Sequence, residues 1–320
     1  MIIGYKFRDW VPIGISALIL FYYLDPLAFL TPVVTIILFT NFLIVGGLLW
    51  WADGYEREPG RTILWSILWG GFVAITITSL TTPGDSFLFL AAVIEEASKL
   101  LGLFWIFKRG SIHSATDALV MGGFIGLGFT ILEDFTYSLG ADDAIGILIY
   151  RGIFSVFAHT LFSGIGAAIM YILWKKLHGG GVIIGFIISY MIHFLWNLSL
   201  SFDLATLSPI VHLIVYAIMP PVVLLVTCIL VRRKELEHIK QNAEMAVSTG
   251  LVSSDLVNQI INRSARRNQL HGVLSISKRN AYRKSLATEA RRILELDRIS
   301  VETLPSAPIE QSDRSDDPWN

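Results

Sequence analysis

The sequence contains few cysteine residues and few charged residues. Cys228 is the single cysteine among 320 residues, which excludes a disulfide framework and any cysteine-rich metal module. The net charge of −1 provides no basic surface of the kind that binds DNA or RNA. Charged residues make up 16% of the chain and hydrophobic residues 53%, whereas soluble domains have about 25% and about 45–50%. With a mean hydropathy of +0.60, this composition also excludes a disordered or collagenous chain.

The few charges are unevenly distributed. Residues 1–231 contain 10 Lys and Arg and 14 Asp and Glu, whereas residues 232–320 contain 15 and 12. We therefore predict an all-α polytopic membrane domain over 1–231 and a cytoplasmic helical tail over 232–302. The tail should form helices to about 247, over about 254–268 and over about 278–298. Residues 303–320, rich in Pro, Ser and Asp, are predicted to be disordered.

Eight segments are long and apolar enough to be transmembrane helices, which need about 20 residues for a core roughly 30 Å thick. Asp25 and Pro26 interrupt the first segment, and the sixth is long enough to require a tilt or a kink. The eight segments are approximately 11–29, 32–51, 62–81, 86–107, 118–139, 145–174, 182–201 and 209–231.

The positions of basic residues support this count. They precede the first segment, follow the eighth, and lie in alternate loops between the segments. The other loops contain no Lys or Arg. The positive-inside rule then predicts a multi-pass protein of the cell membrane with both termini in the cytoplasm. The basic residues are Lys6 and Arg8, Arg57 and Arg61, Lys108 and Arg109, Lys175 and Lys176, and Arg232, Arg233 and Lys234.

Ionisable side chains inside the spans are the candidates for function, because each costs about 2.5–3.5 kcal/mol on insertion scales. They occur on four consecutive spans. These residues, with one nearby amide, are Glu95, Glu96 and Lys99 on the fourth span, Glu133 and Asp134 on the fifth, Arg151 and His159 on the sixth, and His193 and Asn197 on the seventh.

The predicted depths of these residues overlap. At a rise of 1.5 Å per residue, Glu95 lies about 14 Å from the outer surface, Glu133 about 9 Å and His193 about 12 Å, with His159 about 20 Å along a tilted helix. We therefore expect one site in the outer half of the membrane. Glu95 and Glu96 are about 100° apart around their helix, so one can be reactive while the other bonds a neighbouring helix.

The charge of this set leaves alternatives open. Four carboxylates against Lys99 and Arg151 leave two net negative charges in a medium of low dielectric constant. Either the carboxylates keep protons, or a divalent cation such as zinc binds there. The residues also have purely structural explanations. Glu95, Glu96 and Lys99 can form an internal ion pair, the histidines can be core residues, and Asp134 can be solvated.

Four motifs in this region resemble the PrsW family of intramembrane proteases, which belongs with the CAAX prenyl proteases and bacteriocin-processing proteins. The resemblance covers about 86–201, and its motifs fall on four consecutive spans in the order that the family shows. Asp134 departs from the pattern, where we expect Asn. The motifs are EEASK (Glu95–Lys99), FTILED (Phe129–Asp134), His159 in FAHTLFSGIG, and HFLWN (His193–Asn197).

The resemblance implies hydrolysis of peptide bonds within or beside the membrane. In its terms Glu95 or Glu96 is the base, Glu133 and His159 are partners or metal ligands, and His193 with Asn197 surrounds the oxyanion. Lys99 then orients the glutamates, and the metal candidates are Glu133, His159 and His193.

The resemblance also suggests a single-pass membrane substrate, such as an anti-sigma factor. Two other functions stay open: an inactive scaffold of the same fold and a proton-coupled transporter.

Overall fold

The computed structural model describes residues 6–23, 31–54, 57–82, 88–177, 179–201, 208–262, 265, 269 and 276–295. Every regular element in these residues is a helix, as predicted. The chain divides into two compact units. One comprises residues 1–54 and 58–233, and the other comprises residues 55–57 and 234–320.

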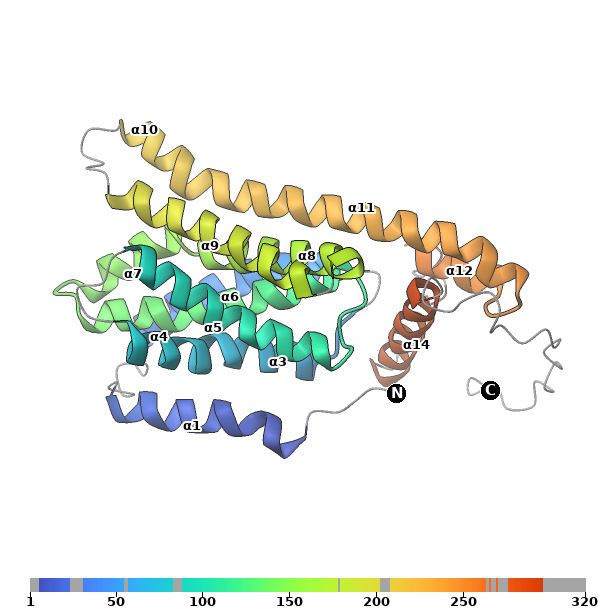
Figure 1. Ribbon diagram of the computed structural model, residues 1–320, viewed down its shortest axis with the longest axis horizontal. Coiled ribbons are helices and arrows are strands. Elements are labelled where there is room, and N and C mark those ends of the chain that lie inside the picture. Colours follow the sequence, from blue (N-terminus) through green and yellow to red (C-terminus); the bar gives the residue numbers. More distant parts are fainter. Residues whose placement is uncertain are drawn as a thin grey trace. The chain divides into compact units, whose positions relative to one another are not determined.

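Helices overlap each of the eight predicted segments, as far as the described residues extend (Figure 1). Six helical segments among the described residues are long and apolar enough to cross a membrane. The other two are α1, which has 17 described residues, and α5, which carries Glu95, Glu96 and Lys99. The elements of the first unit are α1 (Phe7–Tyr23), α2 (Pro32–Ala52), α3 (Gly60–Leu68), the π-helix η2 (Trp69–Ala74), α4 (Ile75–Thr81), α5 (Leu88–Lys108), α6 (Ala115–Leu139), α7 (Ala144–Phe154), α8 (Ala158–Leu177), α9 (Gly179–Ser201), α10 (Pro209–His212), the π-helix η4 (Leu213–Ile218) and the first part of α11 (Met219–Ser248).

The sixth predicted span, for which its length suggested a tilt or a kink, is interrupted by a short turn. Helix α7 ends at Phe154, and α8 begins at Ala158 after a short turn. Within the turn the N–H of Ser155 donates to the carbonyl of Arg151, and that of Ala158 donates to the carbonyl of Ser155. Non-helical backbone at membrane depth is tolerated where it is buried in protein or lines a water-filled cavity. The break therefore points to a cavity beside the next residue, His159.

Helix α6 is the centre of the first unit. It is almost entirely buried and packs against α2, α3, η2, α5, α7 and α8 (Figure 1). A Cβ atom added to Gly126 would lie 2.3 Å from the carbonyl oxygen of His159, and one on Gly128 would lie 2.1 Å from that of Ile67. These glycines let the backbones of neighbouring helices approach closely.

The tail forms the predicted helices around a small apolar core. Helix α11 continues to Ser248, α12 spans Ser254–Ile261 with Ser253 as its N-cap, and α14 spans Ile276–Glu295. Helix α12 is shorter than the predicted helix over 254–268, because the backbone becomes extended at Asn262. Residues 303–320 lie outside the described residues. The core of the tail includes Ile239, Ile260, Leu286 and Ile293.

Candidate active site

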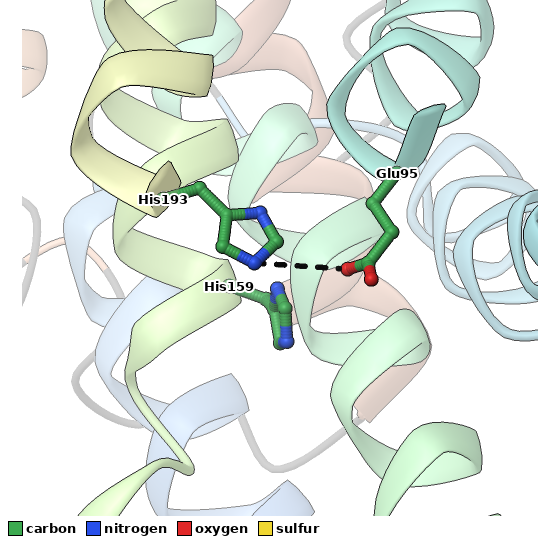
Figure 2. Close-up of side chains that lie close together, drawn as sticks. All are labelled: Glu95, His159 and His193. Carbon is green, nitrogen blue, oxygen red and sulfur yellow. Dashed lines mark ion pairs between the residues drawn. The ribbon is translucent and has the colours of Figure 1, made fainter. Parts of the chain in front are cut away.

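Three of the predicted residues point toward one another from three different helices. Glu95 on α5, His159 on α8 and His193 on α9 surround a common point (Figure 2). The Nε2 atom of His193 lies 3.8 Å from Oε2 of Glu95, and the centroids of the two imidazole rings are 4.9 Å apart. The tertiary structure thus brings together residues that are up to 98 positions apart in the sequence.

Glu96 faces the neighbouring helices. It is fully buried, and its Oε1 atom lies 2.8 Å from Nζ of Lys99 and 2.9 Å from Nδ1 of His193. Its other oxygen accepts hydrogen bonds from the hydroxyls of Ser163, at 3.2 Å, and Ser189, at 2.5 Å. Because this carboxylate oxygen accepts a hydrogen bond, the Nδ1 atom of His193 donates to it, and Nε2 of the neutral ring is left unprotonated.

Glu95 faces the cavity instead. Its Oε2 atom is buried and has no hydrogen-bond partner among the described residues, although Nζ of Lys99 lies 3.6 Å away. One turn of one helix therefore presents two adjacent carboxylates to two different environments. The two carboxylates point in different directions, as their positions on the helix predicted, and Glu95 is the one that faces the cavity.

Lys99 connects the two sides of the site. Its Nζ atom lies 2.9 Å from Nδ1 of His159 and 3.8 Å from the centroid of the Phe129 ring. An ammonium group can only donate, so Nδ1 of His159 accepts and the ring carries its proton on Nε2. Nε2 of His159 in turn lies 3.0 Å from Oε2 of Glu133, which accepts that proton in a hydrogen bond.

Arg151 pairs with two adjacent acidic residues of α6, Glu133 and Asp134. Its NH2 group lies 2.5 Å from Oε2 of Glu133, and its Nε atom bonds to Asp134. Asp134 is fully buried, so the suggestion that it is simply solvated was wrong. Arg151 is a counter-ion, and it holds Glu133 in the position from which that residue receives the His159 hydrogen bond.

A cavity of about 350 Å³ opens on this cluster. Glu95, Glu133, His159, His193 and Asn197 contribute to its wall, together with Ser155 from the break between α7 and α8. Asn197 lies one turn after His193 on α9. The wall also includes Arg151 and the aromatic residues Tyr137, Tyr150, Phe154, Trp196 and Tyr216.

The described residues include one group in this site that could hold a metal ion. One ligand atom from each of Glu95, His159 and His193 lies within 4.8 Å of the others. The sequence suggested Glu133 in place of Glu95, but Oε2 of Glu133 is held by Arg151 and His159. The donor set fits a divalent ion, because Oε2 of Glu95 lacks a hydrogen bond and Nε2 of His193 carries a lone pair.

The four motifs did not indicate the hydroxyl partners of Glu96 or the aromatic residues of the cavity wall. Ser189 carried a usable signal, because it precedes His193 by four residues and Asn197 by eight, so all three share one face of a helix. Ser163 follows His159 by four residues, so these two side chains also share one face of a helix. The aromatic residues gave no signal, because aromatic side chains are common throughout apolar spans.

The family of the chain follows from its match to a protein-family model. The model of the PrsW family intramembrane metalloprotease matches residues 58–226, which include every residue of the cluster. The chain belongs to the PrsW family. It is thus a multi-pass membrane protein of a peptide-hydrolase family, as the four motifs suggested. No curated protein and no solved structure shows a significant match.

Proposed function

We propose that this PrsW-family protein cleaves peptide bonds of membrane-protein substrates at the cavity between α5, α6, α8 and α9. One observation carries the proposal: Oε2 of Glu95 and Nε2 of His193 face each other 3.8 Å apart at the wall of a cavity inside the helix bundle. Both atoms have lone pairs that can accept hydrogen bonds. A water molecule that donates to both of them is held with its oxygen lone pairs directed away from the two acceptors.

Glu95 acts in this proposal as the general base. Its carboxylate takes a proton from the water as the oxygen attacks the substrate carbonyl, and it returns that proton to the departing amine. The Asn197 side chain, also on the cavity wall, donates to the carbonyl oxygen as negative charge develops there. His193 is a second acceptor for the water, rather than the oxyanion donor that the resemblance implied.

The remaining charged residues hold this arrangement in place. Glu96 orients His193, Lys99 offsets the charge of both glutamates, and Arg151 fixes Glu133 so that it orients His159. Such supporting contacts matter because catalytic groups must stay within about 0.5 Å of their productive positions.

A divalent metal ion, zinc being best suited to these donors, would be held by Glu95 and His193 with His159 as a third ligand. His159 can bind it only by giving up its contact with Lys99 or with Glu133. When bound, such an ion lowers the pKa of water and polarises a carbonyl group.

The cavity wall also suggests the substrate. Its aromatic side chains suit an apolar residue, as found near the end of a transmembrane segment. We propose a single-pass protein, such as an anti-sigma factor, cut in the outer half of the cytoplasmic membrane, with both termini of the protease in the cytoplasm.

The test is a comparison of new protein N-termini in membranes that contain the original protein or the Glu95→Gln variant at equal abundance. We expect mass spectrometry to find neo-N-termini of single-pass membrane proteins only with the original protein, close to the outer ends of their spans. Identical sets of N-termini would contradict the proposal. Glu95-dependent ion flux in proteoliposomes without any cleavage would indicate a transporter instead.

Metal removal provides a separate prediction. If a divalent ion participates, dialysis against a chelator should lower the cleavage rate by about 10²-fold or more, and added Zn²⁺ should restore it. The measurement is the rate of cleavage of a single-pass substrate in proteoliposomes before and after dialysis. A rate that is unchanged after complete removal of metal, checked by elemental analysis, would establish that Glu95 works without an ion.

A further inference from the structure

A second set of metal-ligating side chains lies at the other end of α6, away from the cavity. Glu58, His113 and Asp117 each place a ligand atom within 4.8 Å of the others, and all three side chains are buried. Glu58 precedes α3, whereas His113 and Asp117 belong to the connection between α5 and α6 and to the first turn of α6. None of the three contributes to the cavity wall.

Asp117 is held firmly in its orientation. The backbone N–H groups of His113 and Ser114 donate to its Oδ2 atom at 2.8 Å and 3.0 Å, and the Ser114 hydroxyl lies 2.8 Å from Oδ1. Ser114 and Asp117 also form the capping box that begins α6. Carboxylates that bind metal ions are usually fixed by hydrogen bonds of this kind.

His113 and Glu58 are positioned by equally local contacts. The hydroxyl of Tyr171, on α8, donates to the backbone carbonyl of His113, and Nδ1 of His113 lies 3.6 Å from Oδ2 of Asp117. The backbone N–H of Glu58 donates to Oδ2 of Asp53 at 2.9 Å. A separation of 3.6 Å suits two ligand atoms that each lie about 2.1 Å from one ion.

We infer that Glu58, His113 and Asp117 bind a divalent transition-metal ion at a second, structural site. Two carboxylates and one imidazole are a donor set that such ions accept. An ion bound there would tie the connection between α2 and α3 to the start of α6, the helix that also carries Glu133. The two groups share no residue, and Asp117 and Glu133 are 16 residues apart, or about 24 Å along α6.

The test uses the full chain purified in detergent, with Glu95→Gln and His193→Ala introduced together to remove the first group of ligands. Co²⁺ serves as the probe, because its visible absorption reports ligand binding. We expect this double variant to bind one Co²⁺ per chain. Adding Glu58→Gln should weaken binding at least tenfold, whereas adding Glu244→Gln, an exposed glutamate of α11, should not change it.

X-ray absorption of the Co²⁺-loaded double variant provides a readout that does not depend on whether the Glu58 variant folds. We expect a shell of nitrogen and oxygen atoms with one imidazole per ion. Absence of stoichiometric Co²⁺ binding by the double variant would overturn the inference, as would a shell with no imidazole or with two. Binding that survives Glu58→Gln in a folded protein would overturn it as well.

Discussion

Replacing Glu95 with glutamine is expected to lower the rate of peptide-bond cleavage by about 10²- to 10⁴-fold, the contribution of a well-placed general base. Glutamine has nearly the shape of glutamate but cannot accept a proton from water. Because Oε2 of Glu95 has no hydrogen-bond partner among the described residues, the substitution removes no hydrogen bond made by that atom. The free energy of unfolding should therefore stay the same or rise slightly.

Glu96→Gln is the matched comparison, one position away on the same helix. The Glu96 side chain accepts hydrogen bonds from Lys99, His193, Ser163 and Ser189. In glutamine an NH₂ group replaces one of the two acceptor oxygens, so this donor would face other donors. We expect both the cleavage rate and the free energy of unfolding to fall. Single-turnover cleavage in proteoliposomes and unfolding in detergent measure the two effects. A Glu95→Gln variant with full activity would refute the assignment of the base.

Replacing Lys99 with methionine should give the largest loss of stability in the chain, about 3–5 kcal/mol, which is typical when one partner of a buried ion pair is removed. Lys99 is fully buried, and its ammonium group lies 2.8 Å from Glu96, 3.6 Å from Glu95 and 2.9 Å from His159. Methionine fills much of the same volume but leaves the two carboxylates without this counter-charge.

A double variant separates the effect of charge from that of packing. Lys99→Met combined with Glu96→Gln removes one charge of each sign, so it should recover a large part of the lost stability. Lys108→Met, at the exposed end of the same helix, is the control and should change stability by less than about 0.5 kcal/mol. Equilibrium unfolding in detergent measures all three. A Lys99→Met variant as stable as the control would contradict this account of the cluster.

Much of the fold and of the candidate site could be predicted, because the signals are local. The cost of burying a charge in hydrocarbon applies to each residue separately, so the spans follow from the apolar runs. The same argument singles out Glu95, Glu133, His159 and His193 as ionisable residues whose cost inside a span suggests a function. Helical periodicity added that Glu95 and Glu96 face different ways, but not which of them faces the cavity.

What the sequence determined by itself was therefore the set of helices and the short list of ionisable residues inside them that are candidates for function. Only the tertiary structure decided which atoms meet: that Glu95 forms a possible metal-ligand group with the two histidines while Glu133 bonds His159 and Arg151, that Asp134 is paired with Arg151, and that Glu58 reaches the start of α6. These outcomes depend on the rotation of each helix about its axis and on close approaches such as that of Gly126 to His159. Both are set by packing between residues far apart in the chain, which no local pattern records.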